Sequence, residues 1–295
     1  MIEKALNFKC HPFIFGLYRL GLGVFLFIYM LLLSNRWIEF FGPYGISPIK
    51  LRDEITFSRP SLFSYIHTEF GLWVFYVITL FMVLAFILGR WGKVPALFLW
   101  VTLISIQNSL PNNVCAEEFA LCVFAFYAVI MPINSTLVFD FKKRKWSDVQ
   151  THVPAWTLVP FFVHFELIYI ISLPLKPYFD QAWVDGNLIY YAVNTFDMSR
   201  FPGWSIFKVG NAIVSKVMTW ASLVVEGIFP VLVWTRFRVL AILALISFQV
   251  GIAIMLSGVQ MFSLSMILGL ILFLPSKETR LFIRAALSIA NMNAF

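Results

Sequence analysis

Charged residues are scarce in this sequence. They make up 13% of its 295 residues, whereas a soluble globular protein carries about a quarter. A chain that is 60% hydrophobic and has so little charge cannot cover a surface that faces water. The composition therefore excludes an ordinary soluble domain and predicts a membrane protein with many spans.

Cysteine is rare as well. The three cysteines, Cys10, Cys115 and Cys122, have no CxxC or other metal-ligand spacing. We therefore predict neither a disulfide framework nor a metal site. Lysine and arginine exceed aspartate and glutamate by 22 to 15, a net charge of +7. Because many of these basic residues lie in short segments between apolar runs, we interpret the excess as a topology signal and expect no nucleic-acid partner.

Long apolar runs are abundant, and the strict alternation of a β-barrel is missing. A helix needs about 20 apolar residues to cross the hydrocarbon of a bilayer. Eight segments reach or approach that length: Phe13–Ser34, Gly71–Gly89, Pro95–Leu110, Ala116–Asn134, Trp156–Lys176, Val217–Thr235, Val239–Leu256 and Gly258–Pro275. The sequence thus predicts an all-α bundle of about eight transmembrane helices, which forms one domain over residues 1–295.

Basic residues also predict the orientation of this bundle. Short segments rich in lysine and arginine fall on one side when the ends, residues 1–12 and 276–295, are placed in the cytoplasm. Two long segments, 36–70 and 177–216, then lie outside, and their aromatic content is typical of chain at a membrane interface. We expect the plasma membrane of a bacterium, with lipids as partners.

Ionisable side chains inside the predicted spans need a physical explanation. Burying one costs about 2.5–3.5 kcal/mol on insertion scales. Arg19, Glu166 and Glu226 lie at overlapping depths, which predicts an ion pair between Arg19 and either Glu226 or Glu166. Such a pair either fixes the packing of helices or belongs to a proton or ligand site, and the sequence leaves both interpretations open.

Other charged side chains lie at the predicted outer ends of spans. Glu117 and Glu118 open the fourth span, where carboxylates complement the helix dipole. Lys176 closes the fifth span between two prolines and shares a helix face with Glu166 and Tyr169. Lys176 either extends to the lipid headgroups or forms part of a functional site.

An ordered set of motifs accompanies these residues. It comprises Leu17–Gly23, Phe41–Pro48, Ser105–Asn113, Glu117, Glu118, Ile168–Lys176, Trp183–Tyr191, Glu226, Pro230, Phe248, Gln249, Phe262 and Ser263. In this order the set resembles the HTTM family of membrane domains, to which the vitamin K-dependent γ-glutamyl carboxylase belongs. The likeness covers nearly the whole chain.

The resemblance implies a chemistry and a set of site residues. In the carboxylase a lysine deprotonates a reduced quinone, so the resemblance implies a reduced quinone as cofactor. It implies Lys176 as the base and Glu117 and Glu118 as catalytic carboxylates. Residues that would contact the substrate are Gln107, Asn108, Tyr169, Trp183, Asp185 and Tyr190.

The sequence departs from the family pattern at three histidine positions, where it has Gln107, Glu117 and Gln249. The large lumenal peptide-binding domain of the carboxylase has no counterpart in these residues, so we do not expect glutamate carboxylation. Two hypotheses about the function lead. The first is a membrane-embedded enzyme that acts at its outer face on a quinol or another lipid-soluble substrate. The second is a non-catalytic accessory protein for the maturation or export of a secreted peptide. A transporter using Arg19, Glu166 and Glu226 ranks third, since no internal repeat is evident.

Overall fold

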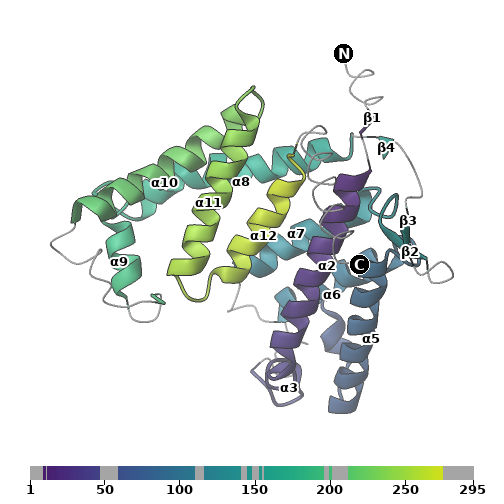
Figure 1. The fold of residues 1–295 in the computed structure, drawn as a ribbon. Coiled ribbons are helices and arrows are strands. Elements are labelled where there is room, and N and C mark those ends of the chain that lie inside the picture. Colours follow the sequence, from purple (N-terminus) through teal and green to yellow (C-terminus); the bar gives the residue numbers. More distant parts are fainter. Residues whose placement is uncertain are drawn as a thin grey trace, which may run out of the picture. The chain divides into compact units, whose positions relative to one another are not determined.

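The structure of the protein is a computed structural model, which describes residues 9–10, 12–46, 59–109, 116–140, 145–147, 153–154, 156–195, 199–200 and 212–274. The chain forms two compact units, Met1–Ala155 and Trp156–Phe295. Helices dominate both units, and the strands that the structure describes are short (Figure 1). The predicted all-α class is confirmed.

The first unit is built on four long helices. These are α2 (Phe13–Ser34), α5 (Glu69–Leu88), α6 (Val94–Ser109) and α7 (Ala116–Ile130). Helix α2 packs against α5 and α7, and α6 packs against α5 and α7. Two antiparallel strand pairs accompany them: β1 (Lys9–Cys10) with β4 (Val153–Pro154), and β2 (Val138–Asp140) with β3 (Lys145–Ser147).

Two short helices occupy part of the segment that the sequence predicts as the first outer loop. They are α3 (Trp37–Phe41) and the 3-10 helix η1 (Leu62–Tyr65). The buried indole of Trp37 donates a hydrogen bond to the Leu72 carbonyl at 3.0 Å. The Phe41 and Phe63 rings stack with centroids 4.4 Å apart. These contacts fix α3 and η1 against α5, so this part of the segment 36–70 is folded structure.

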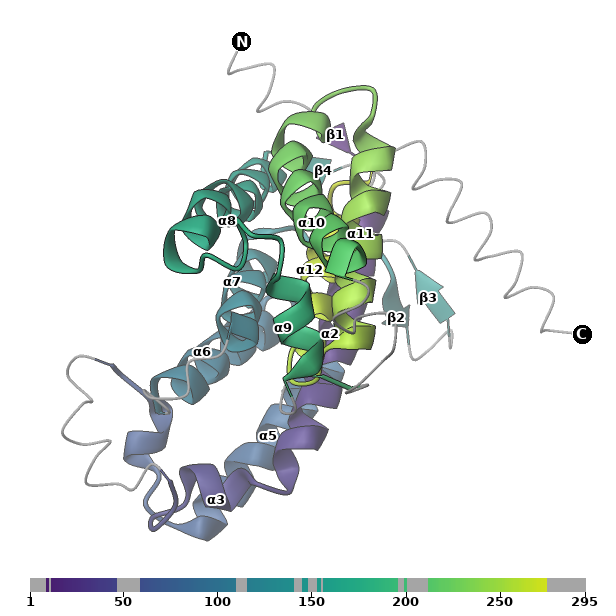
Figure 2. The same cartoon turned by 90° about the vertical axis from the view of Figure 1, so that its left-hand side faces the viewer.

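The second unit contains five helices among its described residues: α8 (Leu158–Phe179), α9 (Leu188–Asn194), α10 (Ala212–Leu232), α11 (Arg238–Met255) and α12 (Gln260–Ile271). Helix α10 is central, because it contacts α8, α9 and α11, while α11 also contacts α12. Figure 2 shows α9 beside one end of α10. The core contains aromatic side chains whose rings pack against one another: Phe161, Phe162, Phe165, Tyr169, Phe229 and Phe273.

All eight predicted segments are helical, but several ends differ. Helix α7 ends at Ile130 and not at Asn134, two residues before Pro132, which has no N–H to donate to the helix. Helix α8 runs past Lys176 to Phe179. Helix α10 begins at Ala212 rather than Val217. The sequence predicts the ends of these helices from where the apolar composition stops. The backbone hydrogen bonds of α8 and α10 continue beyond those positions.

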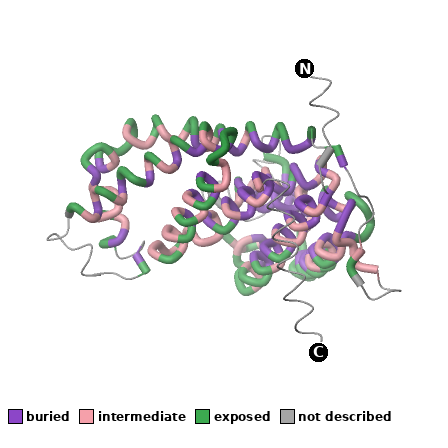
Figure 3. Tube along the Cα trace, turned by 45° about the horizontal axis from the view of Figure 1, so that its top comes forward, coloured by how far each residue is buried: buried purple, intermediate pink, exposed green. Residues whose placement is uncertain are grey.

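Five helices in the described part of the chain have the length and composition needed to cross a membrane: α2, α5, α8, α10 and α11. Helices α6, α7 and α12 are apolar but shorter. Exposed residues recur along most of the helices beside buried ones (Figure 3), and the exposed set includes large apolar side chains such as Val77 and Val231. These helices indicate an integral membrane protein whose outer surface contacts lipid.

A glycine allows the close approach of α2 and α5. A methyl group added at Gly23 would lie 2.5 Å from Cγ1 of Ile87 and 3.2 Å from Cδ1 of Phe86. Gly23→Ala should therefore lower the free energy of unfolding by about 1–3 kcal/mol through overpacking. Thermal unfolding in detergent micelles, followed by helical circular dichroism, measures the change.

The matched control is Gly251→Ala in α11, where an added methyl group meets no atom within 4 Å. Both substitutions remove a flexible glycine from a helix interior, which alone stabilises by roughly 0.5–1 kcal/mol. Gly251→Ala should thus be neutral or stabilising. Equal behaviour of the two variants would contradict close packing at Gly23.

Candidate functional site

Arg19 is a fully buried cation of α2 whose partners are backbone carbonyls. Its Nη1 donates to the carbonyl oxygens of Ile133 at 3.1 Å and Thr136 at 3.4 Å, and its Nη2 donates to that of Leu137. The Asn134 side-chain oxygen accepts a further bond at 3.3 Å. Within the first unit, the partners of Arg19 thus belong to the chain that follows α7, while its predicted pairing with a carboxylate of the second unit stays a prediction. Arg19 therefore anchors that segment to α2.

Glu226 of α10 forms an ion pair with Lys176 of α8. Lys176 is thus a different partner from the arginine that the sequence analysis expected. The Glu226 side chain is 8% exposed and that of Lys176 is 21% exposed. The Lys176 ammonium also lies 4.7 Å from the centroid of the Trp183 ring. Lys176 therefore points to a buried carboxylate beneath an aromatic side chain and not to the lipid headgroups.

The chain around Lys176 explains why its amine lies there. Pro174 and Pro177 lie inside the last turns of α8 and restrict the backbone on both sides of the lysine. After the helix, a carboxylate oxygen of Asp180 accepts a hydrogen bond from the Ala182 N–H at 2.8 Å. This turn brings the chain back, so that Trp183 covers the amine.

Helix α9 and the turn before it are attached to α10. The indole of Trp220 donates to the Val184 carbonyl at 3.2 Å, and the Ile189 N–H donates to the hydroxyl of Thr219 at 3.2 Å. Three residues predicted to contact the substrate lie in this region: Trp183, Asp185 and Tyr190. Trp183 contacts the Lys176 ammonium. Asp185 is exposed and accepts from the side chain of Gln181 at 3.4 Å.

Tyr190, the other predicted contact in this region, is a partly exposed residue of α9. Its ring packs against that of Tyr191 with centroids 5.5 Å apart. No hydrogen bond or ion pair among the residues that the structure describes joins Tyr190 or Asp185 to Lys176. The structure therefore brings only Trp183 of these three side chains to the amine.

Tyr169 and Gln249 place two more polar groups next to this pair. Tyr169 of α8 is 3% exposed and Gln249 of α11 is 2% exposed. The Tyr169 hydroxyl faces Gln249 and lies within electrostatic reach of Glu226. Within the described part of the chain, neither that hydroxyl nor Oε1 of Gln249 has a hydrogen-bond partner. Two buried polar atoms thus remain available beside the Lys176–Glu226 pair.

Glu166 lies further along the same face of α8. Its carboxylate faces Trp234 and is within electrostatic reach of Arg238, at the turn between α10 and α11. Its Oε1 is buried and has no hydrogen-bond partner among the described residues. Glu166 therefore has the α10–α11 turn as its neighbour within the second unit, and its predicted pair with Arg19 of the first unit stays a prediction.

The remaining predicted site residues belong to the first unit. The Asn108 amide donates to the Pro60 carbonyl at 2.8 Å and so ties α6 to the chain before η1. Gln107 is a partly exposed residue in the last turns of α6. Glu118 accepts a hydrogen bond from the hydroxyl of Tyr29 at 3.5 Å, which joins α7 to α2. Glu117 lies in α7, but its side chain lies outside the described part of the structure.

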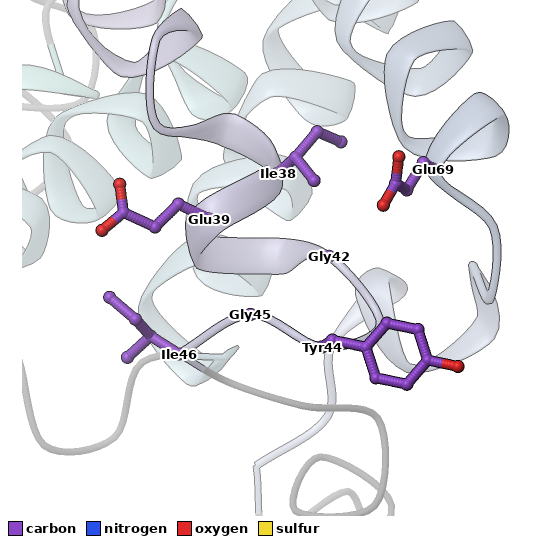
Figure 4. A pocket seen from close by; sticks show the side chains of 7 residues that line it. All are labelled: Ile38, Glu39, Gly42, Tyr44, Gly45, Ile46 and Glu69. Carbon is purple, nitrogen blue, oxygen red and sulfur yellow. The ribbon is translucent and has the colours of Figure 1, made fainter.

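A hollow of about 530 Å³ lies at the end of α3 (Figure 4). It is lined by Ile38, Glu39, Gly42, Tyr44, Gly45, Ile46 and Glu69. Its two carboxylates and Tyr44 are exposed, and none of the predicted site residues lines it. Among the residues that the structure describes, no group of three or more His, Cys, Asp or Glu side chains could hold a metal ion.

The sequence thus singles out Lys176, Trp183, Tyr169 and Glu226. It does not predict that Lys176 contacts both Glu226 and Trp183. It also missed Gln249 as a neighbour of Tyr169 and the turn residues Trp234 and Arg238 as neighbours of Glu166. Lys176 and Glu226 are 50 residues apart. The one available signal was that both belong to the family-like set of motifs.

The role assigned to Arg19 gives a stability prediction. Arg19→Met would remove the buried hydrogen bonds that the guanidinium donates to the carbonyls of Ile133, Thr136 and Leu137. We expect the free energy of unfolding to fall by about 3 kcal/mol, measured by thermal unfolding in micelles. The exposed Arg36 provides the control, because Arg36→Met should change the value by less than about 0.5 kcal/mol. Equal effects of the two substitutions would show that Arg19 is not an anchor.

The chain matches no protein-family model, no curated protein and no solved structure. The resemblance to the HTTM family accordingly rests on the ordered motifs of the sequence itself. The roles of Lys176, Glu226 and their neighbours follow from local geometry and chemistry.

Proposed function

We propose that this protein is an integral membrane enzyme that acts on a quinol, or a comparable weakly acidic and lipid-soluble molecule, at the Lys176–Glu226 pair. The observation that carries the proposal is the ion pair itself, which lies within a unit of apolar helices. Buried ion pairs are costly in such surroundings and commonly mark functional sites. The family resemblance supplies the quinol.

The two residues of the pair have different roles in the proposed reaction. In an ion pair the ammonium carries the proton, so the group that is ready to accept one is the Glu226 carboxylate. In the reaction, the O–H bond of the quinol breaks and its proton forms a new O–H bond with Glu226. The ammonium of Lys176 then stabilises the quinolate oxygen. This assignment moves the role of base from Lys176 alone to the pair.

The surroundings of the pair suit an aromatic substrate from the membrane. Lys176 retains partial exposure, whereas Glu226 is almost completely buried, so a substrate would meet the ammonium first. Trp183 lies over the amine and offers a flat apolar face for a quinol ring. The resemblance also assigns Glu117 and Glu118 to the reaction, and that assignment remains a prediction from the sequence.

We further propose the topology that the sequence predicts: a bacterial plasma membrane, about eight spans and both termini in the cytoplasm. In this topology the shorter apolar helices α6, α7 and α12 also count as spans. Lys176, near the carboxyl end of α8, would then lie toward the outer leaflet, where quinols diffuse.

The enzymatic proposal is tested with a short-tailed naphthoquinol added under argon to the protein in lipid nanodiscs. We expect a difference absorbance typical of the quinolate with the unchanged protein. Lys176→Met should lower the apparent affinity for the quinolate by about 100-fold, because it removes the group that stabilises the anion. Glu226→Gln should abolish the quinolate signal.

Two controls separate chemistry from folding. Lys216→Met removes another partly buried lysine of α10 and should leave the quinolate signal unchanged. The double variant Lys176→Met with Glu226→Gln leaves no unpaired charge, so it should unfold at nearly the temperature of the unchanged protein while forming no quinolate. If Lys176→Met forms quinolate normally, the pair is structural and the accessory function becomes the better interpretation.

The topology has its own test. Green fluorescent protein fused after Phe295 should fluoresce in bacterial cells, because this reporter folds in the cytoplasm, whereas alkaline phosphatase fused there should be inactive. Alkaline phosphatase fused after Asp180, at the end of α8, should be active. The reverse pattern of reporter activities would invert the proposed orientation.

A further inference from the structure

Five polar side chains lie along one side of α8. Glu166, Tyr169 and Lys176 belong to α8 itself, with spacings of three and seven residues that keep them broadly on one face. Glu226 reaches this face from α10 and Gln249 from α11. From Glu166 to Lys176 the helix rises by about 15 Å, roughly half of a bilayer core.

Three atoms in this row are buried and lack a hydrogen-bond partner among the described residues: Oε1 of Glu166, the hydroxyl of Tyr169 and Oε1 of Gln249. A buried polar atom without a hydrogen-bond partner lowers the stability of a protein. Apolar side chains of similar size would avoid that cost, as Phe161 and Phe165 do one turn away on the same helix. Polar groups kept at this cost in an apolar core indicate a use beyond packing.

We propose that Glu166, Tyr169 and Glu226 form a proton path along α8, with Gln249 as a positioning residue. Protons would pass between the Lys176–Glu226 pair and the turn that joins α10 to α11. The proposal goes beyond the quinol chemistry, because it assigns proton movement through the unit whatever the substrate is.

The chemistry of the row suits this role. A carboxylate can take a proton from one side and release it on the other. The Tyr169 hydroxyl can donate its own proton while its oxygen accepts another, so that the phenol is neutral before and after the transfer. Gln249 cannot relay a proton in this way, but its Oε1 can hold the Tyr169 hydroxyl in place. Internal water molecules would bridge gaps longer than a hydrogen bond.

Each end of the proton path lies beside a charged side chain and a residue that is at least partly exposed. At one end Glu226 faces the partly exposed Lys176. At the other, Glu166 faces Arg238 and Trp234, and Trp234 is 60% exposed. The other titratable side chains on the packed helices are His164 and Tyr178 of α8, Tyr190 and Tyr191 of α9, and Lys216 of α10, while α12 contributes none over Gln260–Ile271.

The test measures proton flux with no quinol present. The protein is reconstituted into phospholipid vesicles that contain a pH-sensitive dye, and a potassium gradient with valinomycin drives protons inward. The unchanged protein should acidify the vesicles faster than vesicles without protein. Tyr169→Phe removes a single oxygen atom and should lower the flux roughly tenfold or more, as loss of a proton carrier does in acid–base catalysis. Glu166→Gln should have the same effect.

Tyr191→Phe is the matched control, since it removes the hydroxyl of an exposed tyrosine on α9, and its flux should equal that of the unchanged protein. Thermal unfolding confirms that each variant folds, and if Glu166→Gln does not, Tyr169→Phe decides alone. Flux no faster than in empty vesicles, or unaffected by Tyr169→Phe, would overturn the path. Quinolate formation in nanodiscs is a separate readout, so either proposal can fail without the other.

Discussion

The absence of water in a bilayer core is the constraint on which this structure depends. A polar group placed there must find its partners inside the protein, because the lipid offers none. The eight apolar helices satisfy this condition for the backbone. Buried polar side chains need other partners, because the helix hydrogen bonds satisfy only backbone groups.

The two units treat their buried charges differently. In the first unit, Arg19 is surrounded by backbone carbonyls that accept its hydrogen bonds, so its charge is dispersed over fixed dipoles. In the second unit, Glu226 is paired with the charge of a single side chain, Lys176, and nearby polar atoms of Tyr169 and Gln249 have no hydrogen-bond partner among the described residues. The first arrangement suits a structural anchor. The second leaves groups that can exchange protons or bind a ligand.

This contrast favours the second unit as the place of the proton transfer from the quinol. The first unit also contains polar side chains that the sequence highlighted, but Asn108 and Glu118 join neighbouring elements of the fold. The hollow beside α3 is open, and its carboxylates are exposed. Polar groups that already have protein partners, or that face solvent, bind a substrate less strongly than the buried pair would.

The sequence by itself determined the class of the protein and the positions of its helices, because hydrophobic length and helix periodicity are local properties. It also singled out Arg19, Lys176, Glu166 and Glu226, since any ionisable residue in an apolar run stands out. Only the tertiary structure decided which of these side chains meet. That choice depends on how helices pack across some 50 residues of chain, as between Lys176 and Glu226, and no local pattern encodes which face of one helix meets which face of another.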